Sequence, residues 1–235
     1  WKPGEAYYLP VRAPAGEGRL DPAETLAALR GVLEDPKIGK LGQHLKYDML
    51  VLRAAGVELQ GAQFDTMVAS YLLDAGERNH NLDELAERYL NHSNIKISEL
   101  IGSGKAQIGF WASAVERARD YAAEAADMSL RLHMLLKPRL RGNKLRGFYE
   151  TNARPLPGVV AAMEECGIRI DRQQLAALSD DFTKRLAELE QQIYKLASHP
   201  FNIGSPKQLG DILFDELGLA GGKKNKLGAY GTDAS

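Results

Sequence analysis

The sequence has one cysteine, almost no net charge and no long hydrophobic run. Cys166 as the only cysteine excludes an internal disulfide and a thiolate-rich metal site, and it fits a reducing cytoplasm. The 30 Lys and Arg residues against 31 Asp and Glu residues leave a net charge of −1, so nucleic-acid contacts must rest on local clusters. The absence of an apolar run of ~18–20 residues and of a signal peptide predicts no membrane partner.

The histidines also lack the spacing of metal ligands, so a zinc site is not expected. They are His44, His80, His92, His133 and His199. With 44% hydrophobic and 26% charged residues, the 235-residue chain has the composition of a globular protein with one large or two modest domains.

The first part of the chain alternates short strands with helices, which predicts an α/β domain over 1–143. Strands are expected at 5–11, at 37–43 and at the start of 64–73, and helices at 22–33, 46–56, 80–90 and 113–136. Asp21 followed by Pro22 is typical of a helix start, and Pro138 is expected to end the last helix.

After a polar connector at 139–147 the sequence becomes mostly helical, so a second domain is expected over 144–235. Asp171 is the expected N-cap of a long helix with an apolar seam that requires a partner helix. The seam consists of Leu175, Leu178, Phe182, Leu186, Leu189, Ile193 and Leu196. Ser205 and Gln208 form a second capping pattern, ahead of a basic, glycine-rich tail.

Three segments carry candidate functional residues: GQHLKYD (42–48), FDTMVASYLLDAG (64–76) and RDYAAEAAD (119–127). Taken alone, Asp48 is also explained as an early-helix carboxylate favoured by the helix dipole, and Asp65 as a helix cap. In combination these segments resemble the bacterial DNA polymerase I family (family A), in the part that joins the 3′–5′ exonuclease domain to the polymerase domain. VVAAMEECGIRID (159–171) and FNIGSPKQLGDILFDELGL (201–219) resemble the opening of the polymerase domain and its thumb.

The resemblance implies an RNase H-like exonuclease domain that lacks its first strands, followed by thumb helices. In that family, four carboxylates hold two divalent ions about 4 Å apart for phosphodiester hydrolysis. Asp48 matches the second-motif carboxylate, Ala125 stands at the third-motif Asp, and the first motif is absent. Asp127 lies ~200° around the helix from Ala125 and is not expected to replace it. We therefore expect no exonuclease activity, and no bound Mg²⁺ unless the missing motif is restored.

The resemblance also implies DNA contacts. Gln43, His44 (Asn in the family) and Tyr47 match residues near single-stranded 3′ ends, and Tyr121 matches the tyrosine that positions the attacking water. Contacts with primer–template DNA are implied for Asn202, Ser205, Lys207 and Gln208, and phosphate contact is expected for Lys223, Lys224 and Lys226. Helix capping alone also explains Ser205 and Gln208, and a solvated loop explains the lysines.

Because the chain begins at Trp1, we expect a fragment of a longer, cytoplasmic, template-directed polymerase that acts in DNA replication and repair with Mg²⁺. The fragment is expected to be monomeric, catalytically silent and marginally stable. A standalone RNase D-like 3′–5′ exonuclease and a non-enzymatic DNA-binding relic of a polymerase are the alternatives.

Overall fold

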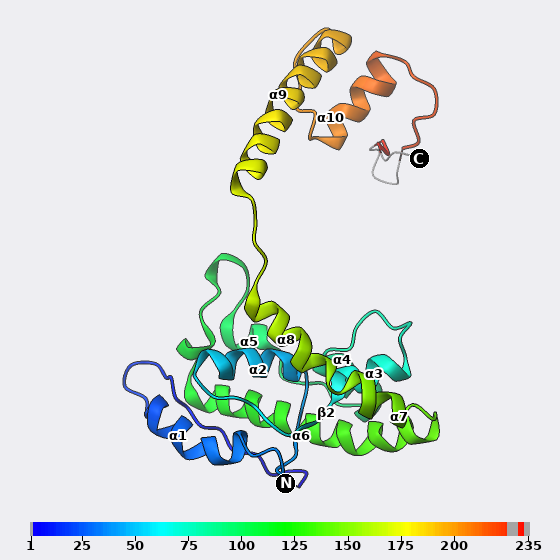
Figure 1. Ribbon diagram of the computed structural model, residues 1–235. Coiled ribbons are helices and arrows are strands. Elements are labelled where there is room, and N and C mark those ends of the chain that lie inside the picture. Colours follow the sequence, from blue (N-terminus) through cyan, green and yellow to red (C-terminus); the bar gives the residue numbers. More distant parts are fainter. Residues whose placement is uncertain (1, 225–229, 233–235) are drawn as a thin grey trace. The chain divides into compact units, whose positions relative to one another are not determined.

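The computed structural model describes residues 2–224 and 230–232, and the chain divides into two compact units (Figure 1). Unit 1 is Trp1–Ile168 and unit 2 is Arg169–Ser235. The expected order of an α/β part followed by a helical part is confirmed. The division lies after residue 168, whereas the expected boundary was 143, because α8 (Leu156–Cys166) packs on α2 (Leu45–Ala54) of the first unit.

Unit 1 contains two short strands and a set of helices around them. Its remaining regular elements are α1 (Pro22–Leu33), β1 (Lys40–Gly42), β2 (Ala62–Asp65), α3 (Thr66–Leu73), α4 (Leu82–Leu90), α5 (Ile97–Ile101), the 3₁₀ turns Gly104–Ala106 and Phe110–Ala112, α6 (Val115–Gly142), α7 (Arg146–Phe148) and the π-helical turn Tyr149–Ala153. Strands β1 and β2 are parallel, with Gly42 opposite Asp65. The carboxyl ends of both strands therefore lead directly into α2 and α3.

The strand expected at 5–11 is not formed. A strand requires a neighbour for its backbone hydrogen bonds, and within residues 2–224 and 230–232 the only named sheet pairs β1 with β2. Tyr7 in this segment is 82% exposed, and the Pro10 carbonyl accepts one hydrogen bond, from Leu20 N–H. The aromatic and β-branched composition of the segment was therefore insufficient to predict a strand.

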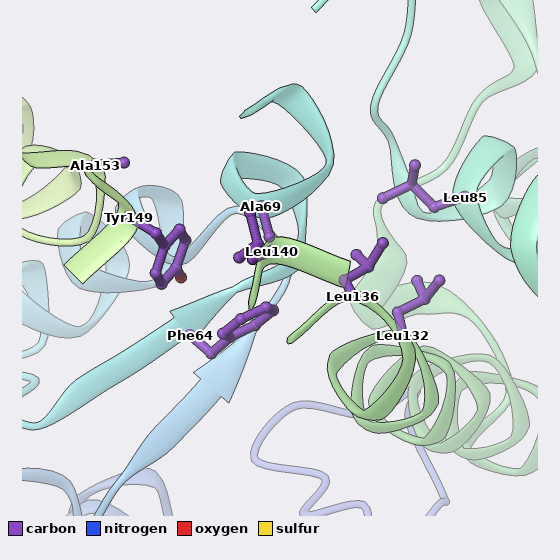
Figure 2. Close-up of a cluster of buried hydrophobic side chains, with 8 residues drawn as sticks. All are labelled: Phe64, Ala69, Leu85, Leu132, Leu136, Leu140, Tyr149 and Ala153. Carbon is purple, nitrogen blue, oxygen red and sulfur yellow. The ribbon is translucent and has the colours of Figure 1, made fainter. Parts of the chain in front are cut away.

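The core of unit 1 lies between β2, α3, α4 and α6 (Figure 2). Its side chains are Phe64, Ala69, Leu85, Leu132, Leu136, Leu140, Tyr149 and Ala153. Tyr149 is 1% exposed, and its hydroxyl oxygen accepts a hydrogen bond from Asp65 N–H at 2.8 Å. Tyr149 therefore fixes the residues after α6 against the end of β2.

Helix α6 continues through Pro138 to Gly142, so the expected end at Pro138 was wrong. An interior proline costs about 3 kcal/mol through a lost hydrogen bond and a clash. Leu136 and Leu140 flank it and are 0% and 2% exposed. Burial of each leucine stabilises the folded state by about 1.5–3 kcal/mol, and together the two offset the cost of the interior proline.

Unit 2 consists of α9 (Arg172–Ala197), α10 (Pro206–Gly210) and a π-helical segment at Asp211–Glu216. The Asp171 side chain accepts hydrogen bonds from Gln173 N–H and Gln174 N–H, as the capping pattern predicts. The seam of α9 stays exposed: Leu175, Leu178, Phe182, Leu186, Leu189 and Leu196 are 47–74% accessible. The partner helix expected for this seam is not among the described residues of unit 2.

Candidate functional site

Four of the predicted site residues lie together at the junction of β1 and α2. Gln43 and His44 follow the strand, and Tyr47 and Asp48 lie in the first turn of α2. His44 adopts the left-handed conformation (φ 62°, ψ 48°), which Asn, Asp and His tolerate better than most residues. The replacement of the family's Asn by His44 therefore keeps the backbone turn, and the His44 and Tyr47 rings stack with centroids 6.1 Å apart.

Asp65 holds this junction in place from the neighbouring strand. Its Oδ2 accepts from Leu45 N–H at 2.8 Å and its Oδ1 from His44 N–H at 3.2 Å. The same Oδ1 accepts from Met67 N–H at 2.9 Å and from Val68 N–H at 3.3 Å. One buried carboxylate therefore caps both α2 and α3 through four backbone N–H groups.

Asp48 lies at the rim of an apolar recess lined by Leu41, Leu45 and Val51. Desolvation raises the pKa of its carboxyl to about 6; the negative charge of Asp65 raises it further and His44 opposes the shift. Asp48 is exposed to solvent, so water screens part of the interactions that raise its pKa. Near neutral pH, Asp48 is an isolated carboxylate at the site that the second motif predicts.

The Gln43 side chain is held at both ends of its amide. Its Nε2 donates to the His80 carbonyl at 2.7 Å, and its Oε1 accepts from Thr66 Oγ1 at 2.5 Å. Thr66 Oγ1 also lies 3.1 Å from the Gly42 carbonyl. Gln43 therefore links β1, α3 and the segment before α4, and these bonds use one of the two N–H donors of its amide.

The other predicted catalytic positions lie on α6. The Tyr121 ring is half-buried beside Phe110, with centroids 5.9 Å apart. Desolvation, followed by the charges of Asp83 and Glu124, raises the pKa of the Tyr121 hydroxyl. Ala125 occupies the third-motif position with a methyl group and provides no oxygen ligand. No described contact joins Tyr121 or Ala125 to the side chain of Asp48.

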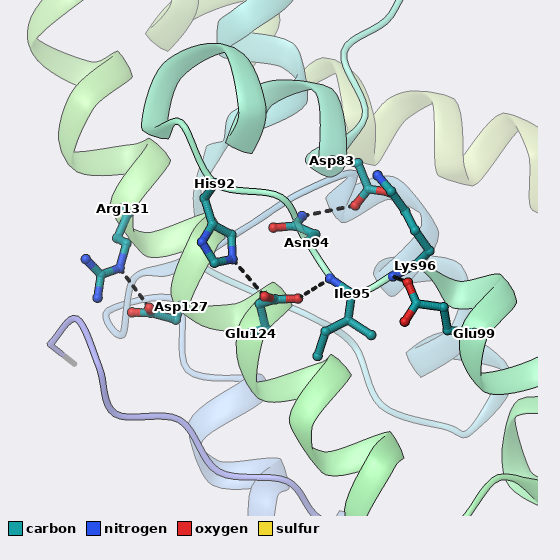
Figure 3. Close-up of polar contacts among 9 residues, drawn as sticks. All are labelled: Asp83, His92, Asn94, Ile95, Lys96, Glu99, Glu124, Asp127 and Arg131. Atoms are coloured by element: carbon teal, nitrogen blue, oxygen red, sulfur yellow. Dashed lines mark hydrogen bonds and ion pairs between the residues drawn. The ribbon is translucent and has the colours of Figure 1, made fainter.

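The acidic side chains near Ala125 are already committed to structural bonds (Figure 3). Glu124 accepts from Ile95 N–H at 2.7 Å and pairs with His92 Nε2 at 2.7 Å. This carboxylate thereby fastens the 92–95 loop to α6. Glu124 therefore does not replace the missing third-motif ligand.

Asp127 is committed in the same way (Figure 3). Its Oδ1 accepts from Gly4 N–H at 2.8 Å, and its Oδ2 accepts from Arg131 Nε at 2.7 Å. Although desolvation opposes them, these bonds hold the pKa of Asp127 below its usual range. Asp127 ties the N-terminal segment to α6 and is not available to a metal ion.

The donor set does not fit the pair of divalent ions that the family implies. Among the described residues, no three His, Cys, Asp or Glu side chains are placed to hold a metal ion. A single carboxylate such as Asp48 does not offset the dehydration and mutual repulsion of two dications.

In unit 2, three of the predicted DNA-contact residues form a local capping network. Ser205 Oγ accepts from Gln208 N–H at 3.4 Å, and Gln208 Oε1 accepts from Asn202 N–H at 2.9 Å. Asn202 Oδ1 accepts from Gly204 N–H at 3.0 Å. Lys207 is exposed in the first turn of α10, and its side-chain ammonium has no hydrogen bond or ion pair in the described part of the chain.

The basic tail is organised around an aromatic residue that sequence reasoning missed. Lys224 forms an isolated antiparallel bridge with Tyr230, and its Nζ lies 4.3 Å from the centre of the Tyr230 ring. The interaction with Tyr230 raises the pKa of the Lys224 ammonium. The Lys223 side chain is exposed, and Lys226 lies outside the described residues. An aromatic residue a few positions beyond a basic run is the signal that indicates such a cation–π contact.

Comparisons with known proteins agree with this order of domains. A family model described as 3′–5′ exonuclease matches residues 1–141, and one described as DNA polymerase family A matches residues 172–235. DNA polymerase I of Rhizobium leguminosarum is 46% identical over 93% of this chain and 21% of its own length. DNA polymerase I of Pseudomonas aeruginosa is 43% identical over 93% of this chain and 24% of its own length. The chain thus spans between a fifth and a quarter of these relatives.

A solved structure shows the same fold. The POL domain of Pol1 from M. smegmatis, in complex with DNA primer-template and dNTP, is similar with a TM-score of 0.68 and 30% identity. The match covers 93% of this chain and 35% of that one. The polymerase match over 172–235 argues against a standalone RNase D-like exonuclease. Among the described residues, none of the helices has the length and apolar character needed to cross a membrane. The chain belongs to the bacterial DNA polymerase I family of family A DNA polymerases, with a 3′–5′ exonuclease domain followed by a segment of the polymerase domain.

Proposed function

We propose that this chain is part of a template-directed DNA polymerase that acts in DNA replication and repair, and that its exonuclease domain is catalytically silent. The donor set of unit 1 carries this proposal: Asp48 stands alone, and Ala125 has no ligand atom. In the longer protein, Mg²⁺ and deoxynucleoside triphosphates act at palm and fingers residues beyond this sequence. The exonuclease fold then serves as a support for the polymerase.

We further propose that unit 2 binds the primer–template duplex. Lys207 and Lys223 are exposed and unpaired within the described residues, and Lys224 is oriented by Tyr230. Cationic side chains around a glycine-rich loop suit sequence-independent phosphate contact. In unit 1, the exposed Tyr47 ring and the stacked His44 remain as a surface for single-stranded 3′ ends.

The duplex proposal is tested by charge reversal of Lys223 and Lys224 to Glu. We expect weaker binding to a primer–template duplex, and a salt dependence whose log–log slope falls by about 2, because each lost phosphate contact removes ~0.9. Fluorescence anisotropy at several salt concentrations measures the affinity for the duplex and its salt dependence. Lys184→Glu with Lys195→Glu on exposed positions of α9 is the charge-matched control. Equal losses in both double variants would reduce the effect to net charge and contradict the assignment.

A further inference from the structure

An apolar cavity of about 860 Å³ lies in unit 1 beside α3, the segment 78–81 and the start of α8. Its aliphatic lining residues are Met67, Val68, Leu72, Ala153 and Leu156. The Tyr71 and Phe148 rings also line it and are 55% and 53% exposed. The volume lies in the range of ~300–1,000 Å³ that is typical of binding pockets, and an uncovered apolar wall favours an apolar group of a partner.

A strongly basic segment leads into the wall of this cavity. Between residues 137 and 146, at the end of α6 and the start of α7, the sequence has five cations and no Asp or Glu. The cations of this basic turn are Lys137, Arg139, Arg141, Lys144 and Arg146. All of them are exposed. Arg146 and the cavity residue Phe148 both belong to α7, so the positive charge continues directly into the apolar wall.

The charge of the basic turn is not neutralised within the described part of unit 1. Arg139 lies over the Tyr89 ring, with its Cζ 4.8 Å from the ring centre. The side chains of the other four cations have no hydrogen bond or ion pair among the described residues. Arg78 adds an exposed, unpaired guanidinium at the cavity itself, where none of the described lining residues is Asp or Glu.

The acidic side chains next to the cavity in the sequence are already engaged. Glu77 pairs with Arg88 at 3.2 Å, and Glu150 pairs with Arg154 at 3.1 Å. Asp74 accepts a hydrogen bond from a tyrosine hydroxyl at 2.6 Å. The unpaired charge around the cavity is therefore positive, and a partner with carboxylates is complementary to it.

Three asparagines add hydrogen-bond donors to the cavity walls. The Oδ1 atoms of Asn79 and Asn81 accept from Asn81 N–H and Glu84 N–H, and that of Asn152 accepts from Thr151 Oγ1. These bonds use the amide oxygens, so the three NH₂ groups remain unpaired among the described residues. An extended peptide has a carbonyl oxygen at every residue and supplies acceptors for such donors.

Helix stability explains only part of the basic turn. Arg139 and Arg141 lie in the last turn of α6, where the helix dipole favours cations. Lys144 and Arg146 follow the end of that helix. Lys144 has φ 59°, a left-handed conformation in which Gly or Asn is less strained than Lys. The fold of the turn therefore does not account for the positive charge at Lys144 and Arg146.

We propose that the cavity and the basic turn together bind an acidic segment of a partner protein. A large apolar side chain of that segment occupies the cavity, and its carboxylates lie on the basic turn and on Arg78. The bases of a nucleic acid have hydrogen-bonding edges that Met67, Val68 and Leu72 would leave unpaired, whereas an aliphatic or aromatic side chain has none. The proposal concerns a protein partner and does not depend on the polymerase role proposed above.

The test begins with selection of a random-peptide phage library on the immobilised 235-residue chain. We expect enrichment of acidic sequences that contain Leu, Phe or Trp. The enriched peptide, labelled with fluorescein, is then measured by anisotropy. Phe148→Ala should weaken its binding about tenfold or more, the effect of losing an aromatic contact at the centre of an interface. Leu156→Ser is a second cavity variant, because this leucine is 55% exposed and its replacement leaves the core intact.

A double variant tests the charge of the basic turn. Lys144→Gln with Arg146→Gln should weaken peptide binding severalfold at ~0.1 M salt and much less at ~1 M, since the Debye length falls from ~10 Å to ~3 Å. The matched control is Arg12→Gln with Arg19→Gln, at exposed arginines of unit 1 that have no partner in the described chain. This control removes the same charge and should leave the affinity unchanged.

Crosslinking locates the bound segment. The enriched peptide with benzoylphenylalanine at its apolar position should crosslink to residues within 67–81 or 148–156, as mapped by mass spectrometry. No enrichment, enriched peptides without acidic residues, unchanged affinity in both cavity variants, crosslinks elsewhere, or equal losses in the two charge variants would overturn the proposal. An oligothymidylate that loses affinity in these variants while the peptide does not would assign the surface to nucleic acid and would also overturn it.

Discussion

Asp65 organises the candidate site of unit 1 more than any residue of the exonuclease motifs does. Its carboxylate accepts from the N-termini of α2 and α3, and its own N–H donates to the buried Tyr149 hydroxyl oxygen. The position of Asp48 therefore depends on a residue whose sequence context indicates only a helix cap. A negative charge at two helix N-termini is also favoured by both helix dipoles.

Replacement of Asp65 by Ala is expected to lower the free energy of unfolding by about 2–4 kcal/mol, since each lost cap costs up to about 2 kcal/mol. Asp21→Ala is the matched control because Asp21 caps α1 alone and accepts from Glu24 N–H at 2.9 Å. Its expected cost is about 1 kcal/mol. Urea denaturation followed by circular dichroism measures both, and equal costs would contradict the double-cap role.

The raised pKa of Asp48 gives a pH dependence of definite sign. Its carboxyl titrates at about 6 in the folded protein against 3.8 in the unfolded chain, so the folded state binds the proton more tightly. The stability that this proton provides is present below pH ~4 and is lost as the pH rises through ~6. Asp48→Asn should therefore flatten the pH profile of unfolding between these values and stabilise the protein at pH 7. An unchanged profile would show that Asp48 is fully solvated.

Single residues were predicted from the sequence where their role is local. Asp21, Asp171 and Ser205 cap helices as their spacing indicates. The engagement of Gln43 with His80, 37 positions away, and of Glu124 with the 92–95 loop was not predicted. Those bonds depend on the tertiary fold, which no local pattern of residues encodes.

Helices and strands were likewise predicted correctly where the residues that determine them lie within the element itself. The helix at Pro22–Leu33 has its cap and its first-turn proline within its own sequence, and it was predicted correctly. The segment 5–11 requires a partner strand, and the end of α6 depends on the burial of Leu136 and Leu140. Both misassignments thus arise from contacts made by residues far away in the sequence.

The exposed seam of α9 gives a prediction about this element. Leu186 is 66% exposed, so Leu186→Ser should change the free energy of unfolding of this chain by less than about 0.5 kcal/mol. Ile212 in the following segment is 4% exposed, and Ile212→Ala should cost about 2–5 kcal/mol. Thermal melts compare the two variants. A large cost at Leu186 would show that the seam is covered in solution.

At the scale of the whole chain, the exonuclease-domain match contrasts with the donor set of the described residues, in which no three His, Cys, Asp or Glu side chains are placed to hold a metal ion. The family match spans residues 1–141, and the sequence resemblance assigns Tyr121 and Asp48 to the exonuclease motifs. Ala125 lacks a ligand atom, and Glu124, Asp127 and Asp65 are each held by other bonds. The described residues therefore match the exonuclease domain but do not provide a cluster of metal ligands.

A nuclease assay on a 5′-labelled single-stranded oligonucleotide with Mg²⁺ or Mn²⁺ tests this contrast most directly. We predict no shortening from the 3′ end by the chain, and none by Ala125→Asp, because two carboxylates still do not hold two dications. Progressive shortening by the unmodified chain that Asp48→Asn abolishes would contradict the account, since it would require metal ligands that the described residues do not provide.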